Sequence, residues 1–456
     1  MLINKLDNVE VNLSDGHKYA LRDIAKGENI IKYGNPIGHA TEDIKKGEHV
    51  HTHNVKTNLS DKLTYSYEET VQDFPVADSG KTFMGYVRSN GDVGIRNEIW
   101  IINTVGCVNK IAEKLAAKTG AYAFVHPFGC SQLGDDQSLT QKILRGLVNH
   151  PNAAGVLVLG LGCENNNIEL FKTVLGEYDP QRVRFMNCQD EEDEIAAGVA
   201  IIEELKAYAD QFKPQPVPVS KLRVGLKCGG SDGYSGITGN PLVGRFSDKL
   251  ISMGGSCVLT EVPEMFGAEH LLMQRAENRE IFNKTVDLIN DFKDYYTRHN
   301  QVVYENPSPG NKKGGITTLE EKSLGCVQKG GKAPVVDVLD YGDILSKNGL
   351  SLLNGPGNDI VAITNLTAAG AHIILFTTGR GTPLGAPVPT VKVATNHDLA
   401  VRKSDWIDFD SSPVLEGVDL DDTFFDYIVE VASGKQTKNE ENGYREISIF
   451  KDGVTL

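Results

Sequence analysis

The side chains best suited to chemistry in this sequence stand at the ends of its apolar segments. Cys107 follows EIWIINTVG, Cys130 follows AYAFVHPFG, Cys163 follows GVLVLGLG, Cys188 follows RVRFMN and Cys228 follows LRVGLK. These segments have the length and composition of buried strands. The carboxyl ends of parallel strands meet at one edge of a sheet, where α/β proteins bind their ligands. The pattern therefore predicts crevices lined by thiols.

A cysteine in such a place need not react, because a thiol also packs well as a small hydrophobic group. Packing is the better interpretation for Cys107, Cys188 and Cys257. Polar, glycine-rich neighbours surround the four that we predict as metal ligands: Cys130, Cys163, Cys228 and Cys326. The sequence has no C-x-x-C, H-E-x-x-H or EF-hand motif, so a metal site must assemble from distant segments. Thiolates favour iron over Mg²⁺, and an iron–sulfur cluster is the alternative.

Three histidines alternate in the stretch HVHTHN, at His49, His51 and His53. On a strand, residues i, i+2 and i+4 share one face, so the three imidazoles would project together. Such a face could bind a metal or transfer protons near neutral pH. It could also be an exposed strand face that is merely polar. We predict His51 and His53 as catalytic residues, with His126 as a further candidate.

Glycine-rich loops carry a second set of polar side chains. Arginine matches a carboxylate with two parallel hydrogen bonds, and hydroxyl and amide groups can bind the hydroxyls of a ligand. Loops of this composition are also often simple turns. Together they suit a small, acidic, polyhydroxylated ligand. The predicted substrate-binding residues are Arg88, Arg96, Asn97, Ser231, Asp232, Arg380 and Thr382.

Composition excludes several classes of function. The 456 residues include 46 Lys+Arg and 61 Asp+Glu, a net charge of −15, which argues against binding to nucleic acid or to anionic lipid. No apolar run approaches the ~20 residues of a membrane span, and the polar start is no signal peptide. Seven widely spaced cysteines without an export signal indicate reduced thiols, and hence a cytoplasmic protein. Whether the chain forms a homo-oligomer is left open by the sequence.

The type of secondary structure that is expected to position these residues changes along the chain. Residues 1–62 read as short strands and turns, 63–82 as a linker, and 83–212 as alternating strands and helices typical of parallel β-α-β units. A Pro-rich linker at 213–221 leads into a second α/β region at 222–456. There we expect DIVAIT to be a strand, ENPSPGNKKGG (305–315) an exposed loop, and Cys326 to lie in a loop. The fold class is α/β: a small all-β module, then two α/β domains with mostly parallel sheets.

Six of these motifs together carry a family resemblance: GYVRSNGDVGIRN, HPFGCSQ, GLGCENN, GLKCGGSDGYSGITGNP, EEKSLGCVQKGG and TTGRGTPLGAPVPTVKVATN. In this order, over about residues 83–400, they resemble the altronate/galactarate dehydratase family of sugar-acid dehydratases. The module before them resembles the SAF-type β-clip domain of that family. The resemblance implies a hydro-lyase of hexuronate catabolism that converts D-altronate to 2-dehydro-3-deoxy-D-gluconate. It also implies Fe²⁺ or Mn²⁺ as the cofactor.

Two alternatives remain beside that function. The substrate could be galactarate or another aldarate or aldonate, or the chain could bind a sugar acid without turning it over. Dehydration removes the proton alpha to the carboxylate and expels the beta hydroxyl, so it needs a base and stabilisation of an enolate-like dianion. A divalent metal that binds the carboxylate supplies that stabilisation. His51 or His53 would serve as base or ligand, and Arg88, Arg96 and Arg380 would hold the carboxylate.

Overall fold

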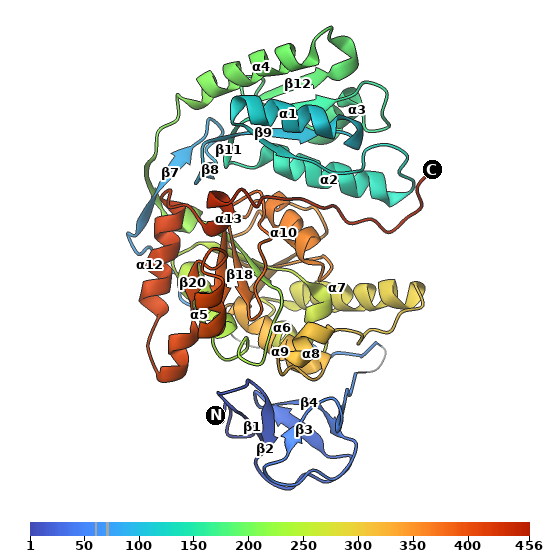
Figure 1. Cartoon of the computed structure of the whole chain (residues 1–456), viewed down its shortest axis with the longest axis vertical. Helices are drawn as coiled ribbons and strands as arrows, with labels where there is room; N and C mark the ends of the chain where they lie inside the picture. The colour runs from blue at the N-terminus through green and yellow to red at the C-terminus, as the bar shows by residue number, and fades with distance from the viewer. Residues whose placement is uncertain (60–61, 70–72) are drawn as a thin grey trace.

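A computed structural model of the chain describes residues 1–59, 62–69 and 73–456. Figure 1 shows three bodies along the long axis, with the N-terminal module at the lower end. The order in space differs from the order in sequence, because the C-terminal α/β region lies between the module and the region that precedes it in the chain. The module therefore packs against the C-terminal region. One cluster of buried apolar residues includes Val9 and Ile30 of the module together with Val224 and Leu242.

The module is built from two small antiparallel sheets. One has the order β1-β2-β5, with β1 at Val9–Val11, β2 at Lys18–Ala20 and β5 at His49–Val50. The other has the order β3-β4-β6, with β3 at Asn29–Lys32, β4 at Asn35–Ala40 and β6 at Val55–Lys56. Alternate residues of β1 and β2 are buried, as expected for a sheet with one covered face. This confirms the prediction of an all-β module.

The region that follows is centred on a parallel sheet with the order β10-β9-β11-β12. Its strands are β9 (Glu98–Asn103), β10 (Tyr122–Phe124), β11 (Ala153–Gly160) and β12 (Val183–Asn187). Helices α1 (Asn109–Thr119), α2 (Asp135–Asn149), α3 (Ile168–Leu175) and α4 (Glu194–Ala209) connect or follow them. A small antiparallel sheet, β13-β7-β8, joins β7 (Thr82–Val87) and β8 (Val93–Gly94) to β13 (Gln215–Pro218). The expected linker at 213–221 thus contains a paired strand.

The C-terminal region holds a seven-stranded parallel sheet with the order β16-β17-β15-β14-β18-β19-β20. The strands are β14 (Arg223–Cys228), β15 (Ser256–Leu259), β16 (Val335–Leu339), β17 (Gly349–Leu353), β18 (Ile373–Thr378), β19 (Thr390–Ala394) and β20 (Phe409–Asp410). The chain leaves β14 toward β15 and later fills the other side with β18, β19 and β20. The strand order therefore reverses between β14 and β18, and ligands of open α/β sheets bind at such a reversal.

Nine helices accompany this sheet in the described part of the region. They are α5 (Gly239–Ser252), α6 (Glu269–Met273), α7 (Arg279–Arg298), α8 (Pro309–Lys313), α9 (Leu319–Cys326), α10 (Asp359–Ala368), α11 (His397–Arg402), α12 (Asp421–Ala432) and α13 (Lys438–Glu441). No described helix is both long enough and apolar enough to cross a membrane.

Four local expectations are wrong. DIVAIT begins α10, whose N-terminus is capped by the Asn358 side chain; an apolar run of that length does not separate a strand from a buried helix. Residues 305–315 contain α8, which Ser308 and Asn311 cap reciprocally. Cys326 ends helix α9. The strand through the histidines stops at Val50, because a turn closes when the Asn54 amide N–H donates to the His51 carbonyl at 3.0 Å.

Candidate active site and metal centre

Two of the predicted metal ligands meet at the carboxyl end of β14. Cys228 is the last residue of that strand and Cys326 the last residue of α9, and their sulfur atoms lie 3.3 Å apart. Glu264, just beyond β15, places Oε2 3.2 Å from each sulfur. In the described residues this is the single group in which three metal-type ligand atoms lie within 4.8 Å of one another. All three side chains are buried.

Lysines surround this group, which we call the thiol–Glu264 cluster. Lys329 Nζ lies 2.9 Å from the sulfur of Cys228, and Lys322 Nζ lies 2.8 Å from Glu264 Oε1. The hydrogen bond from Cys326, helped by Lys329 and Lys227, lowers the pKa of Cys228 to about 6 despite burial. The same hydrogen bond, together with burial, raises the pKa of Cys326 well above its usual value. The pair therefore holds one thiolate and one thiol at neutral pH.

The carboxylate of the cluster is also ionised. Burial alone would raise the pKa of Glu264, but Lys322, Lys227 and Lys329 outweigh it and the pKa is lowered. A thiolate, a second thiol and a carboxylate are donors of the kind that Fe²⁺ accepts, and Mn²⁺ takes the carboxylate more readily than sulfur. The donor set thus fits a divalent transition metal, with iron ahead of manganese.

A hollow of about 510 Å³ opens beside this cluster, and we call it the α8 hollow. Its walls are residues 229–230, 264, 305–309, 311–312, 322 and 357–359. Lys322 reaches from the thiol–Glu264 cluster into the wall, where its Nζ also lies 3.0 Å from Asn306 Oδ1. Amide, hydroxyl, carboxylate and ammonium groups all contribute to the lining, and such groups can bind the hydroxyls and carboxylate of a sugar acid.

Arg380 stands between the α8 hollow and a second hollow. A Cβ placed on Gly310 of α8 would lie 3.6 Å from Arg380 Cδ and Nε. On its other side, Arg380 lines a hollow of about 590 Å³ with Leu13–Asp15 of the module and Asn396–Asp398. Its guanidinium has no hydrogen bond or ion pair with any residue that the structure describes, so its donors are free for a ligand.

The other predicted residues near this edge support the loops. Asp232 accepts hydrogen bonds from Ser235 Oγ, Thr395 Oγ1 and Asn396 Nδ2, and burial raises its pKa. Thr382 Oγ1 accepts from the Leu384 amide at 3.2 Å. Ser231 Oγ is buried and has no hydrogen-bond partner in the described chain.

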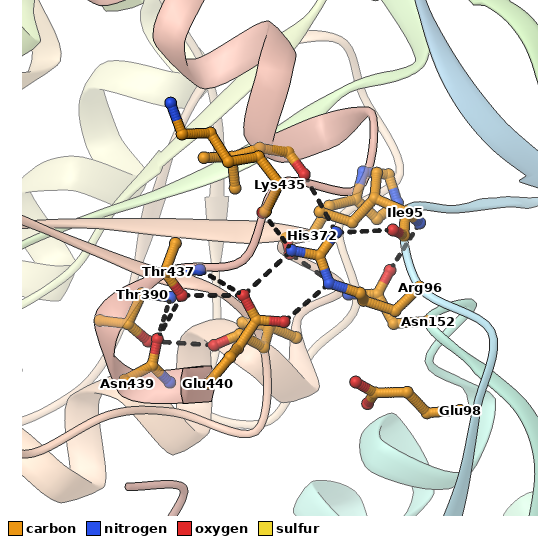
Figure 2. Close-up of polar contacts among 12 residues, drawn as sticks. Ile95, Arg96, Glu98, Asn152, His372, Thr390, Lys435, Thr437, Asn439 and Glu440 are labelled. Carbon is orange, nitrogen blue, oxygen red and sulfur yellow. Dashed lines mark hydrogen bonds and ion pairs between the residues drawn. The ribbon is translucent and has the colours of Figure 1, made fainter. Parts of the chain in front are cut away.

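Arg88, Arg96 and Asn97 lie elsewhere, around β8 and the start of β9. Figure 2 shows the Arg96 guanidinium facing the Glu440 carboxylate, with Nε–Oε1 at 2.7 Å and Nη2–Oε2 at 3.0 Å. Arg88 donates to Pro151 O, Arg96 O and Asn97 Oδ1 at 2.7–2.8 Å. Protein acceptors occupy these guanidinium groups. A contact with substrate stays a prediction that this geometry does not favour.

The histidines do cluster, although not as the sequence suggested. The rings of His49 and His51 lie 5.4 Å apart and those of His49 and His53 5.5 Å apart, across the turn rather than along a strand. His17, which the sequence reasoning missed, joins them with Nδ1 2.9 Å from His49 Nε2. His17 directly precedes β2, and β2 pairs with β5 so that Lys18 lies opposite Val50. This strand pairing is the feature that could have predicted that His17 joins the other histidines.

Hydrogen bonds to other residues hold the imidazoles of two of the predicted catalytic histidines. Burial first, and then the charge of Lys18, lower the pKa of His51 to about 4, and its Nδ1 lies 3.0 Å from Thr317 Oγ1. His126 is buried against β9, with Nε2 2.8 Å from the Asn103 carbonyl and Nδ1 accepting from the Phe128 amide. Burial lowers the pKa of His126 to about 4. Both imidazoles are neutral at pH 7.

The structure does not bring all four predicted thiol ligands together. Cys130 and Cys163 are exposed at the edge of the four-stranded sheet. Cys130 Sγ lies 3.3 Å from Asn165 Oδ1, and Gln189 Nε2 lies 3.6 Å from Cys163 Sγ. Neither belongs to the thiol–Glu264 cluster. β11 ends three residues before Cys163, but β10 already ends at Phe124, six residues before Cys130. Both cysteines follow strands of the four-stranded sheet, whereas Cys228 ends a strand of the seven-stranded sheet, so the four thiols do not meet at one site.

Sequence reasoning also missed the acidic and basic residues of the cluster. Glu264 is the last residue of the expected strand CVLTEVPE, whereas β15 ends at Leu259, and nothing in the sequence showed that β15 would lie beside β14. Lys322 and Lys329 flank Cys326 in EEKSLGCVQKGG. Lysines four residues before and three after a buried cysteine were a usable signal, because they lie on the same face of a helical turn.

Comparisons with known proteins agree along the whole chain. Residues 3–58 match the family described as Altronate/galactarate dehydratase SAF domain. Residues 85–210 match D-galactarate dehydratase/Altronate hydrolase, second domain, and residues 219–455 match D-galactarate/Altronate dehydratase, C-terminal. The chain belongs to the altronate/galactarate dehydratase family. This confirms the resemblance and the prediction of a sugar-acid hydro-lyase.

Individual members of the altronate/galactarate dehydratase family differ in their similarity to this chain. It is 55% identical to the altronate dehydratase of Bacillus subtilis strain 168, over 98% of this chain and 93% of that protein. It is 52% identical to the altronate dehydratase of Escherichia coli strain K12, over 100% and 99%. Identity falls to 32% with the galactarate dehydratase (L-threo-forming) of the same strain, over 96% and 90%.

Proposed function

We propose that the chain is a D-altronate dehydratase, which converts D-altronate to 2-dehydro-3-deoxy-D-gluconate and water in hexuronate catabolism. The observation that carries the choice of substrate is the identity of 52–55% to two altronate dehydratases, against 32% to a galactarate dehydratase. Galactarate is therefore the second candidate. The enzyme would work in the cytoplasm.

The α8 hollow is the proposed substrate site. Its ammonium groups, Lys312 and Lys322, and the free guanidinium of Arg380 at its edge, would attract the sugar-acid carboxylate. Asn306 and Asn358 offer amide groups to the hydroxyls along the carbon chain. Asp232 and Thr382 would act through the loops that they brace, and Ser231, whose hydroxyl has no partner in the described chain, stays a sequence-based candidate for contact with the substrate. His51 and His53 stay the sequence-based candidates for the base.

The thiol–Glu264 cluster would hold the divalent metal, with Cys228, Cys326 and Glu264 as ligands. When bound, Fe²⁺ or Mn²⁺ supplies Lewis-acid stabilisation of the negative charge that develops on the carboxylate as the alpha proton leaves. Two thiols fall short of the four cysteines that usually hold an iron–sulfur cluster, so a mononuclear metal is preferred. Lys322 and Lys329 would keep the sulfur and carboxylate ligands ionised and in place.

A single preparation tests the proposal. Protein purified without oxygen and loaded with Fe²⁺ or Mn²⁺ should form a 2-keto acid from D-altronate faster than from galactarate. Glu264→Gln and Cys326→Ser should lose bound metal, whereas Cys257→Ser, a buried cysteine away from the cluster, should keep it. Light scattering on the same sample decides between a monomer and a homo-oligomer. Binding of D-altronate with no keto acid formed would point to a sensor and refute the enzyme.

A further inference from the structure

The α8 hollow contains three carboxylates, and only one is both anchored and free to take a proton. Glu264 Oε1 accepts from Lys322, and its Oε2 lies 3.2 Å from each sulfur of the cysteine pair. Glu305 is exposed and has no hydrogen bond or ion pair within the described chain. Asp359 is different, because its Oδ1 accepts from Lys227 Nζ at 2.7 Å while Oδ2 has no hydrogen-bond partner in the described residues.

Asp359 is held firmly although its side chain is 40% exposed. It is the first residue of α10, which Asn358 caps. Lys227 is fully buried and also contacts Glu261 and the carbonyl oxygen of Cys228, so it cannot swing away from Asp359. A Cβ on Gly229 would lie 2.9 Å from both carboxylate oxygens. Only glycine at position 229 leaves this carboxylate where it is.

The same contacts join Asp359 to the thiol–Glu264 cluster. Lys227 bridges Asp359 to the backbone of Cys228, whose sulfur lies 3.2 Å from Glu264 Oε2. Metal ligands and this carboxylate are thus fixed to one another through a single lysine. The histidines have no such link, since neither His51 nor His53 is among the residues that line the hollow.

We propose that Asp359 is the catalytic base of the dehydration, and that Lys227 is its positioning residue. The proposal rests on the proposed function. Asp359 Oδ2 takes the proton from C2 of the sugar acid, the C2–H electron pair forms the C2=C3 bond, and the C3–O bond breaks. The departing hydroxide takes the proton back from Asp359 and leaves as water. The enol then gains a proton at C3 and loses one from its hydroxyl to give the 2-keto acid.

The surroundings of Asp359 suit both halves of this cycle. Lys227 and the N-terminus of α10 hold the carboxylate in place through Oδ1 and leave Oδ2 free toward a ligand in the hollow. A group that has taken a proton as general base can return it to the leaving oxygen as general acid in the next step. One carboxylate in the hollow can therefore serve as base and then as acid on the same face of the substrate.

Asp359→Asn in the full-length, metal-loaded enzyme tests the assignment. The matched control is Asp421→Asn, because Asp421 is likewise the first residue of a helix, α12, and pairs with a basic side chain, Arg245, but lies outside the hollow. We expect Asn to lower kcat by about 10²- to 10⁴-fold, with D-altronate binding by calorimetry changed less than threefold. In D₂O, the variant should also stop exchanging the C2 hydrogen of D-altronate, as followed by NMR. Asp421→Asn should keep kcat within about twofold.

Two further variants keep the test decisive if Asp359→Asn folds poorly. Asp359→Glu retains a carboxylate and should keep measurable turnover, and added formate should partly restore Asp359→Ala. An Asp359→Asn enzyme with kcat within threefold of the parent, or an Asp359→Ala enzyme that formate does not help, overturns the assignment. A parent enzyme that dehydrates no sugar acid would instead refute the proposed function, so the two failures are distinguishable.

Discussion

Glu321 offers the sharpest test of how the module is attached to the C-terminal region. It is buried on α9 between two buried lysines of the module, with Lys18 Nζ at 2.9 Å and Lys32 Nζ at 2.8 Å. Its Oε2 also accepts the Thr317 amide at 2.7 Å. The three side chains are at most 1% exposed, so bulk solvent does not screen these charges. Glu321→Ala therefore leaves two ammonium groups buried without a counter-ion.

The size of the effect follows from the ionisation of the carboxyl group. Burial works to raise the pKa of Glu321, but Lys18 and Lys32 lower it from 4.5 to about 2. A shift of that size corresponds to about 3 kcal/mol of preference for the ion. Losing one partner of a buried ion pair costs about 3–5 kcal/mol in other proteins. We expect Glu321→Ala to weaken docking of the module by that amount.

Native-state hydrogen exchange measures this without unfolding the rest of the chain. Amides of the module, such as those of β2 and β4, should exchange faster in Glu321→Ala, while amides of β14 and β18 should not. Glu320→Gln is the control, because Glu320 accepts from Thr57 Oγ1 and the Asn58 amide, and glutamine can still accept both. Docking weakened by less than 1 kcal/mol in Glu321→Ala would refute the reasoning.

A fall in pH and the substitution of apolar residues both test the same three charged side chains. A carboxyl group whose pKa is depressed in the folded state stabilises it above its unfolded pKa, and this is lost as the pH falls through the folded value. The module should therefore loosen as the pH drops from 4.5 toward 2. Replacing Lys18, Lys32 and Glu321 together by methionine should recover docking lost in Glu321→Ala, because a buried ion cluster can often be exchanged for apolar groups of similar volume.

Three further predictions concern the site. A chelator should abolish activity and Fe²⁺ or Mn²⁺ should restore it; an enzyme indifferent to chelation would remove the metal. Hydrogen peroxide should form a disulfide between Cys228 and Cys326 in metal-free protein, because their sulfurs lie 3.3 Å apart, and should leave Cys257 as a free thiol. Differential alkylation followed by mass spectrometry tests this, and a reductant should reverse the disulfide. With Asp359 as the base, His51→Ala and His53→Ala should each lose less than about 10²-fold in turnover. A larger loss in either variant, with unchanged circular dichroism, would assign the base to an imidazole, and full activity in both would exclude them.

The strand ends were predictable from sequence, but their neighbours were not. Cys228 follows a buried apolar run, and the glycines beside it indicated a crevice. Its partners Glu264 and Cys326 lie 36 and 98 residues further along the chain. They reach it only because β15 lies beside β14 and because α9 ends next to the same edge. Side-chain periodicity carries no information about which strands become neighbours in a parallel sheet.

Ambiguous local signals account for the other differences. Asp359 was hidden in DIVAIT, where a short apolar run fits a buried helix as well as a strand. His17 was isolated in the sequence and joined the other imidazoles only through strand pairing. Arg96 had the neighbours of a ligand-binding residue, yet a carboxylate 344 residues away occupies its guanidinium. An arginine in a polar loop does not reveal whether its anion is a substrate or another part of the chain.

Helix α9 has a consequence for how this protein can change over generations. All eight of its residues are buried, and along that length it meets the module through Glu321, the α8 hollow through Lys322 and the thiol pair through Cys326. A mutation that shifts the helix along its axis would change the contacts at all three places at once. Sequence drift in the module and drift in the catalytic region are therefore not independent. Tolerance of a change in one should depend on the genetic background of the other.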